Sequence, residues 1–520
     1  LKQFGLWSAF PCAPRRIQRR GAARAMASAA PAPAAASGAK SMVEAAGSAA
    51  LALLNAQPPD SSTLGNMRTL DLRGLELKQV PSNLSCCSSL VRLDLGNNPL
   101  ASFPEEVSSL KELEIMFASN MDAKEVPAVL ANCPRLRIVG LKDNRLVTID
   151  GSRLPPELVW LIAAGNPVQE LPNISHLQRV RKLMLSHNRL TCEALAAVAG
   201  IADLEMLRVA ANRLESFPEA LLRHSRLSWV AAGSNPFSDA ALKDRLAAAP
   251  AVVDFAEVSV GERLGSGAGA TVYRGKWKGR DVAVKIWEAE EFSDGTSRGE
   301  WAANRVASSP GHSSLVEVLG VFEQPRPGMI LELLSGAIAA ASPPSFVTVT
   351  RDALPTGDGK GPWFTAAAAL QLAESVASAT AYLHAKGVLH GDIYLHNTLV
   401  ITGAEGASRS GAPSRADVED ARLSDFGAAA VVPDDDVGRG LQRIEVRSFG
   451  WLLQDLVEML DAPPGLPPAE GETLRLLRTV RERCGQTDVD KLPTCTEVAA
   501  LLSHGLGKRP RVGGEGLSAL

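Results

Sequence analysis

The chain has 520 residues, too many for one ordinary core, so two or more domains are expected. Its 46% hydrophobic and 21% charged residues are typical of a globular protein, and a formal net charge of −3 gives no overall attraction to nucleic acid or anionic membranes. The seven cysteines form no CxxC pair, which favours reduced thiols over a zinc framework. No run of about 18 apolar residues is present, so no membrane span is predicted.

The N-terminal region has an unusual composition. Residues 1–43 contain seven Lys or Arg residues and no acid, as in an organelle transit peptide. The chain begins with Leu1, however, and Met26 offers a second interpretation, in which the preceding stretch is a translated leader. We expect residues 1–62 to be disordered because they are rich in Ala, Pro and Ser. The predicted location is cytoplasmic, with organelle targeting as the alternative.

A repeat occupies the region from 63 to 245. The pattern LxxLxLxxNxL recurs every 22–24 residues, as in "LVRLDLGNNPL" (90–100) and "LRIVGLKDNRL" (136–146). Eight copies begin near residues 67, 90, 113, 136, 158, 180, 204 and 227. Alternating apolar positions predict a short strand in each copy, and one coil cannot bury its apolar face alone, so the coils are expected to stack.

Asparagines and prolines recur at fixed offsets in these repeats. The asparagine amides can satisfy backbone groups left unpaired at each turn; they are Asn98, Asn144, Asn166, Asn188, Asn212 and Asn235. The prolines are expected to interrupt the convex side before each next coil; they are Pro81, Pro104, Pro127, Pro172 and Pro218. The region resembles an α/β leucine-rich-repeat solenoid, a family whose concave strand face usually binds a protein partner. No nucleic acid partner is expected.

The sequence changes character after Asn235. The stretch "LKDRLAAAPAVVDF" (242–255) predicts a last helix and a short linker, placed at 246–254. Next, "LGSGAGATVYRGKWKGRDVAVKIW" (264–287) puts glycines in a turn, where backbone N–H groups can approach phosphates closely. On the following apolar strand, period-two alternation places Ala283 and Lys285 on one face, so the lysine can reach those phosphates.

Two further motifs follow in order. "VLHGDIYLHN" supplies Asp392, a candidate acceptor for the proton of an incoming hydroxyl, and Asn397, a candidate metal ligand. "ARLSDFG" supplies Asp425 as a second metal ligand. Each motif alone could be an ordinary turn, but their order along the chain makes coincidence improbable.

Together these motifs resemble the eukaryotic protein kinase fold over residues 255–505, nearest the tyrosine-kinase-like group. The resemblance implies an α+β bilobal domain, followed by a flexible tail at 506–520, that uses ATP and Mg²⁺. It implies catalytic roles for Asp392, Lys285, Asn397 and Asp425, with Asn397 and Asp425 holding the metal. The residues implied to bind ATP or to position Lys285 are Leu264, Gly265, Ser266, Gly267, Ala268, Gly269, Val272, Ala283, Lys285, Glu300, Glu332 and Leu334. Glu290 and Glu291 compete with Glu300 for the pair with Lys285, and His390 would brace the loop.

The chain departs from the kinase pattern in several places. Gly391, Tyr394 and His396 stand where kinase subgroups carry basic residues, so preference for Ser/Thr or Tyr cannot be derived from the loop. The segment "AAAVVPDDDVGRGLQRI" (428–444) is short, is predicted to be a loop, and contains no Ser, Thr or Tyr. Glu445 replaces the aspartate of the helix written DVYSFG in relatives. A polar insert at 407–420 is predicted to be a mobile loop.

Three functions are compatible with these patterns. The favoured one is a protein kinase, acting on Ser/Thr rather than Tyr hydroxyls, whose repeats recruit a protein substrate or regulator. The second is a pseudokinase scaffold, suggested by the shortened segment after Gly427. The third is a small-molecule phosphotransferase, because "HGD" with an asparagine five residues on also resembles the aminoglycoside-kinase loop.

Overall fold

The computed structural model describes residues 34–100, 102–243, 245, 252–267, 269–354, 363–402, 415–461 and 471–507. The chain divides into two compact units, with the boundary between Val180 and Arg181. Several sequence predictions concern residues outside the described ranges: the N-terminal leader up to 33, Ala268, most of the linker, the insert up to 414 and the tail from 508. The domain limits derived from the sequence therefore stay predictions.

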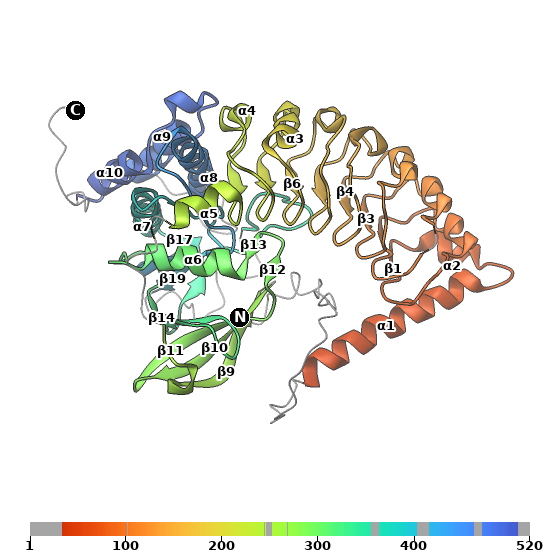
Figure 1. The fold of residues 1–520 in the computed structure, drawn as a ribbon, viewed down its shortest axis with the longest axis horizontal. Helices are drawn as coiled ribbons and strands as arrows, with labels where there is room; N and C mark the ends of the chain where they lie inside the picture. Colours follow the sequence, from red (N-terminus) through yellow and green to blue (C-terminus); the bar gives the residue numbers. More distant parts are fainter. Residues whose placement is uncertain are drawn as a thin grey trace. The chain divides into compact units, whose positions relative to one another are not determined.

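The first unit is built from leucine-rich-repeat coils, each with one short strand (Figure 1). Its strands are β1 (Thr69–Asp71), β2 (Arg92–Asp94), β3 (Ile115–Phe117), β4 (Ile138–Gly140) and β5 (Trp160–Ile162), and each pairs in parallel with the next. Every strand begins two residues after a predicted repeat start. Its 3₁₀ helices are η1 (Ser82–Cys86), η2 (Glu105–Ser109), η3 (Ala128–Asn132), η4 (Gly151–Arg153) and η5 (Ile174–His176). Pro81, Pro104 and Pro127 stand immediately before the first three of these helices.

The repeated asparagines satisfy the backbone as predicted. The buried Asn144 amide donates to Ala118 O (2.8 Å) and Leu141 O (3.0 Å) and accepts from Met121 N (2.9 Å). One side chain thus joins two neighbouring coils through groups that the short strands leave unpaired.

A helix covers the start of the solenoid, contrary to the predicted disorder of residues 1–62. Helix α1 (Ala34–Asn55) is followed by α2 (Ser61–Asn66). Leu54 is fully buried, and a Cβ on Gly47 would lie 2.9 Å from Asp71 O, so the helix backbone contacts the first coil closely. Asn83 donates to Leu54 O (2.9 Å). The alanine-rich composition read as disorder is also the composition with the highest helix propensity, and a terminal coil needs a cover for its apolar face.

The second unit begins with the last three coils. They contain β6 (Lys182–Met184), β7 (Met206–Arg208) and β8 (Trp229–Ala231), which pair in parallel. The connecting helices are α3 (Cys192–Ala196), η6 (Ala197–Gly200), α4 (Glu219–Leu222) and α5 (Pro236–Lys243). Helix α5 begins at Pro236, a residue favoured in a first helical turn. The helix and linker predicted within 242–255 stay a prediction, because most of residues 244–251 lie outside the described ranges.

The rest of the second unit forms two lobes. The smaller lobe has a five-stranded antiparallel sheet in the order β14-β15-β11-β10-β9. These strands are β9 (Val258–Ser266), β10 (Ala270–Trp277), β11 (Arg280–Trp287), β14 (Val318–Phe322) and β15 (Gly328–Glu332), preceded by η8 (Phe255–Glu257). The hairpin β12 (Glu291–Phe292) and β13 (Gly295–Thr296) leads into α6 (Ser297–Ala307), which Thr296 caps through Gly299 N (2.9 Å).

The larger lobe is mainly helical. Its helices are α7 (Ala366–Ala385), α8 (Asp436–Asp461), α9 (Glu472–Cys484), η10 (Val489–Lys491) and α10 (Cys495–Gly505). Its short strands are β16 (Ile338–Ala339), β17 (Trp363–Phe364), β18 (Val388–Leu389), β19 (Thr398–Thr402), β20 (Arg415–Ala416), β21 (Val418–Leu423) and β22 (Ala430–Val431). Leu372 of α7 and Phe449 of α8 are fully buried in one apolar core, and this core includes Ile393 and Leu395 of the catalytic loop.

Helix α8 corrects one prediction. The stretch 428–444 was expected to be a loop, but the helix already begins at Asp436. Asp435 caps this start by accepting from Gly438 N (3.0 Å), and Leu441 and Ile444 are buried. Asp434, Asp435 and Asp436 therefore lie at the N-terminus of this helix, where the helix dipole favours negative charge.

Candidate active site

Three strands of the smaller lobe align the glycine turn with the lysine. Val272 of β10 is the register partner of Gly265 on β9 and of Lys285 on β11. The turn predicted to cover phosphates and the lysine predicted to reach them thus lie in one row across the sheet, with strand β10 between them. Ala283, two residues before Lys285, is buried.

Lys285 is held by two carboxylates. Its Nζ contacts Glu300 Oε1 of α6 and lies 3.6 Å from Asp425 Oδ1. Trp287 Nε1 donates to the other Glu300 oxygen (2.8 Å). Burial would lower the pKa of Lys285, but the carboxylates of Glu300 and Asp425 more than offset it, so the pKa is raised and the lysine stays charged. Of the three glutamates weighed from the sequence, Glu300 is the one in contact with Lys285.

The catalytic loop brings Asp392 and Asn397 together. Asn397 Nδ2 donates to Asp392 O (2.9 Å) and to Asp392 Oδ2 (3.0 Å). The loop is tied to the Asp425 segment, because Ser424 N donates to Asn397 O (2.9 Å) and His390 Nε2 lies 3.0 Å from Ser424 O. His390 thus contacts the segment it was expected to brace.

Glu445 of α8 holds the catalytic loop from behind. Its carboxylate accepts from Gly391 N (2.5 Å) and His390 N (3.3 Å), and pairs with His384 (2.8 Å). Burial would raise the pKa of Glu445, and these partners more than offset it, so the pKa is lowered. Glu445 therefore accepts hydrogen bonds from the loop N–H groups, although its side chain is one methylene longer than that of aspartate.

The other predicted ATP contacts lie around this centre. Leu264, Gly265 and Ser266 end β9, and Gly267 and Gly269 stand on either side of Ala268. A Cβ on Gly269 would lie 2.7 Å from the Phe292 ring, so this glycine permits a close approach within the protein. Glu332 ends β15, and its N–H donates to Glu317 O (3.0 Å); Leu334 follows two residues later.

The residues predicted to hold a metal have suitable chemistry. Asp425 has a left-handed backbone (φ 62°) and a carboxylate that is 59% exposed, and Asn397 offers an amide oxygen. Mg²⁺ prefers oxygen ligands and is commonly held by one or two protein groups together with substrate phosphates. Across the described residues, no group of three or more His, Cys, Asp or Glu side chains could hold a metal alone. The carboxylate of Asp425 and the amide oxygen of Asn397 are of the ligand type that Mg²⁺ prefers.

One residue at this site was not predicted from the sequence. Arg208, on strand β7 of a repeat coil, donates from Nη2 to Asp392 Oδ1 (2.5 Å) and from Nη1 to Gly391 O (2.8 Å). Its Nε lies 2.9 Å from Asp294 Oδ1, in the turn between β12 and β13. Burial would raise the pKa of Asp392, and Arg208 is the largest of the influences that lower it overall. In the repeat pattern this position is variable, so only the docking of the coils reveals it.

Aromatic and basic side chains fix the coils against the larger lobe. Trp229 of β8 stacks on Tyr394 of the catalytic loop, with ring centroids 4.8 Å apart and planes at 3°, and donates to Ile393 O (3.2 Å). Arg447 of α8 donates to His224 O (2.6 Å) and Leu227 O (3.1 Å) in the last coil. Trp229 is 1% exposed and Arg447 4%, so both side chains are buried in this contact.

Several known proteins are similar in sequence to part of this chain. The protein kinase domain family model matches residues 258–443. Mitogen-activated protein kinase kinase kinase 7 of Bos taurus is 24% identical over 274 residues, covering 48% of this chain and 44% of its own length; the Homo sapiens protein has the same identity and is covered over 42%. A probable serine/threonine-protein kinase of Dictyostelium discoideum is 31% identical over 153 residues, 28% of this chain and 8% of its own. This chain thus spans less than half the length of these relatives.

A leucine-rich-repeat protein of Leptospira interrogans is similar to 34% of this chain, at 21% identity, with a TM-score of 0.27 and 57% of its own chain covered. Within this chain, the match assigns a protein kinase domain to residues 258–443. The repeat coils with their parallel strands precede this domain in the chain.

Proposed function

We propose that the chain is an ATP- and Mg²⁺-dependent protein kinase that transfers the γ-phosphoryl group to protein hydroxyls, Ser/Thr rather than Tyr. The observation that carries the proposal is the assembled pair of clusters: Lys285 with Glu300 and Asp425, and Asp392 with Asn397. The preference for Ser/Thr is supported by the name of the Dictyostelium relative.

Each residue has a defined task in this proposal. Lys285, kept charged by Glu300, binds the phosphates beneath the turn that contains Gly265 and Gly267. Asp392 accepts the proton of the attacking hydroxyl. Asn397 and Asp425 would hold Mg²⁺, which neutralises charge on the transferred phosphoryl group. Glu445 and His390 keep the loop in place.

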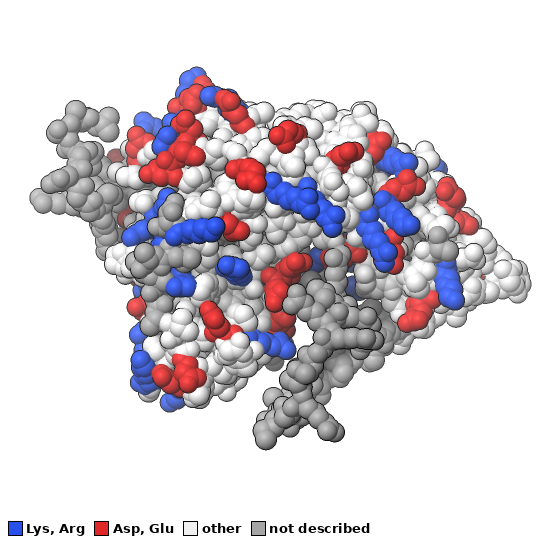
Figure 2. Space-filling view, in the orientation of Figure 1, with Lys and Arg blue, Asp and Glu red and all other residues white. Residues whose placement is uncertain are grey.

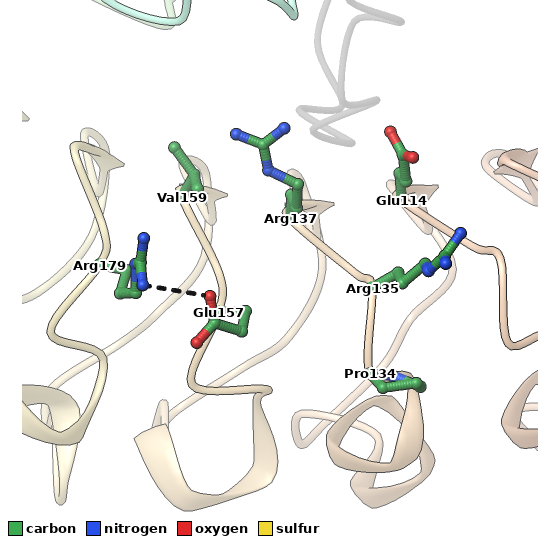
Figure 3. A pocket seen from close by; sticks show the side chains of 7 residues that line it. All are labelled: Glu114, Pro134, Arg135, Arg137, Glu157, Val159 and Arg179. Atoms are coloured by element: carbon green, nitrogen blue, oxygen red, sulfur yellow. Dashed lines mark ion pairs between the residues drawn. The ribbon is translucent and has the colours of Figure 1, made fainter.

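The coils of the first unit are the proposed recruitment surface for a protein partner. A pocket of about 370 Å³ lies on them, with both charge signs around it (Figure 3); it is lined by Glu114, Pro134, Arg135, Arg137, Glu157, Val159 and Arg179. Arg179 and Glu157 pair at 3.5 Å, whereas Arg137, directly before β4, extends away from the ribbon. Basic and acidic groups are interspersed on the face shown in Figure 2. A partner surface of mixed charge would complement this pocket.

No helix among the described residues is long and apolar enough to cross a bilayer. The cytoplasmic location expected from the sequence is a proposal, to be checked by imaging the tagged chain.

The test is phosphotransfer by the purified full chain. Incubation with γ-labelled ATP, Mg²⁺ and generic protein acceptors should label the acceptor, and Lys285→Met should abolish labelling. Phosphoamino-acid analysis of the product then separates Ser/Thr from Tyr. Equal labelling by wild type and Lys285→Met would contradict the proposal.

A pseudokinase remains the second candidate, because one specific observation favours it. Both Asp392 carboxylate oxygens have partners, Arg208 and Asn397, in the folded chain. Nucleotide-induced thermal stabilisation without labelling of any acceptor would support this candidate over the first.

A further inference from the structure

The catalytic loop contains no basic side chain next to its aspartate. The position before Asp392 is Gly391, and Tyr394 stands two residues after it. Gly391 has φ 75° and no room for a side chain, since a Cβ there would lie 2.4 Å from Ala428 O and 3.0 Å from Val230 O. An arginine could not stand at 391 without moving the coil strand or the segment after Gly427.

A basic side chain nevertheless reaches Asp392, from another part of the chain. Arg208 donates separately to the carboxylate of Asp392 (2.5 Å) and to the carbonyl of Gly391 (2.8 Å). The planar guanidinium spreads these donors in a fixed geometry, so it defines the position of the backbone and the side chain together. The Arg208 side chain is only 3% exposed.

The charges around Arg208 are balanced. Arg208 faces two carboxylates, Asp392 and Asp294, and the second ion pair measures 2.9 Å. Lys182, one strand away on β6, is also buried and interacts with both carboxylates. Two cations and two anions thus meet at the contact between coils and lobes, so each buried cation has carboxylates near it.

The contact that delivers Arg208 has the character of a permanent one. Trp229, stacked on Tyr394, is almost fully buried, and Arg447 donates to carbonyls of the last coil. His187, in the coil that contains β6, lies 2.8 Å from Phe292 O, beside the hairpin that carries Asp294. Separating these surfaces would expose buried aromatic and charged groups, which argues against a lid that opens in each cycle.

We propose that Arg208 is a positioning residue of the kinase reaction, supplied by the repeat domain in place of the basic residue that the catalytic loop lacks. It holds the Asp392 carboxylate and the Gly391 carbonyl in the orientation needed to accept the substrate proton. The last three coils are therefore part of the catalytic unit, while the coils before them are left for recruitment. This inference rests on the proposed kinase activity.

The same contact has an opposite interpretation, in which Arg208 blocks the proton acceptor and restrains the enzyme. Asp392 keeps 23% of its side-chain surface exposed while paired, so a substrate hydroxyl can still approach it. The observations favour positioning. The test distinguishes the two interpretations by whether kcat of Arg208→Gln falls or rises.

The test compares four full-length proteins: wild type, Arg208→Gln, Arg208→Lys and the control Arg213→Gln. Arg213 lies in the same coil as Arg208 and is exposed. Loss of a positioning contact to the general base should lower kcat of Arg208→Gln by about 10–100-fold. The KM for ATP should change less than about threefold, because Arg208 contacts Asp392, which is not itself a predicted ATP ligand. Arg208→Lys should recover part of kcat, and Arg213→Gln should match wild type.

Thermal melts of each variant establish that the comparison is made between folded proteins. Hydrogen exchange of residues 388–397 gives a readout that does not need activity: Arg208→Gln should exchange faster there than Arg213→Gln. An increased kcat in Arg208→Gln would overturn the proposal in favour of restraint. Unchanged kcat with unchanged exchange would also overturn it. If wild type transfers no phosphate, the proposed function fails, and the positioning of the loop is then decided by the exchange result alone.

Discussion

The Glu445 carboxylate accepts a 2.5 Å hydrogen bond from the N–H of Gly391, directly before the catalytic aspartate. The donor lies in the catalytic loop and the acceptor 54 residues later in helix α8. The loop that carries Asp392 is therefore fixed to the central helix of the larger lobe.

Replacing Glu445 by Gln should destabilise the fold in a pH-dependent way. The pKa of Glu445 is lowered from its ordinary 4.5 in the folded protein, so its ionised form stabilises the fold above about pH 4.5, and this stabilisation is lost as the pH falls through the folded pKa. We expect a cost of about 2–3 kcal/mol at pH 7 that shrinks in acid, because hydrogen bonds to a buried charge are at stake. Urea unfolding at pH 7 and pH 4 measures the difference. Glu458→Gln, on the exposed side of α8, is the control; a cost that stays constant with pH would contradict the assignment.

Trp229→Ala should weaken the contact between the last coil and the catalytic loop. Removing a fully buried tryptophan typically costs about 3–5 kcal/mol. Because Trp229 stacks on Tyr394, the loop should lose order as well. Calorimetry of the full chain should show a lowered Tm. Trp277→Ala, on a partly exposed ring of β10, should lower it much less.

Activity should not depend on phosphorylation of the segment after Gly427. In many kinases an arginine before the catalytic aspartate pairs with a phosphate on this segment. Here that position is Gly391, and residues 428–444 contain no Ser, Thr or Tyr. Much of this stretch is instead the first part of α8. Treatment with a broad phosphatase, verified by mass spectrometry, should leave the rate within about twofold of the untreated enzyme; a drop of about tenfold or more traced to this segment would contradict the account.

Glu300→Gln should impair the use of ATP while sparing the fold of the repeats. Glu300 and Trp287 hold Lys285 in place, and a neutral amide would orient the lysine less firmly. We expect kcat/KM for ATP to fall by about 10–100-fold. Glu291→Gln is the matched control, since the Glu291 side chain is 71% exposed. Equal losses in the two variants would show that the effect is not specific to the pair with Lys285.

The repeats were predictable because their spacing is periodic: each strand begins two residues after a predicted repeat start. The order of motifs gave Lys285, Asp392, Asn397 and Asp425, which the fold brings together. Helix α1 was missed because alanine-rich sequence is compatible with both helix and disorder. The start of α8 at Asp436 was not predicted, because a family resemblance matches the motifs and does not show where the helices between them begin.

Arg208 could not have been found from the sequence. It occupies a variable position of a repeat strand, 184 residues before Asp392, and nothing in the repeat pattern distinguishes it from its neighbours. Its role depends on which coil packs against the larger lobe, and tertiary contacts such as Trp229 with Tyr394 decide that. The absence of a basic side chain at Gly391 was visible in the sequence, but the residue that contacts this position was not.

The most direct measurement is single-turnover transfer from γ-labelled ATP by the full chain and by Asp392→Asn, with nucleotide affinity measured in parallel. If Asp392 accepts the hydroxyl proton, the variant should transfer phosphate about 10²–10⁴-fold more slowly while binding ATP with nearly unchanged affinity. Equal transfer rates for the two proteins would contradict the central claim that this chain is a kinase acting through Asp392.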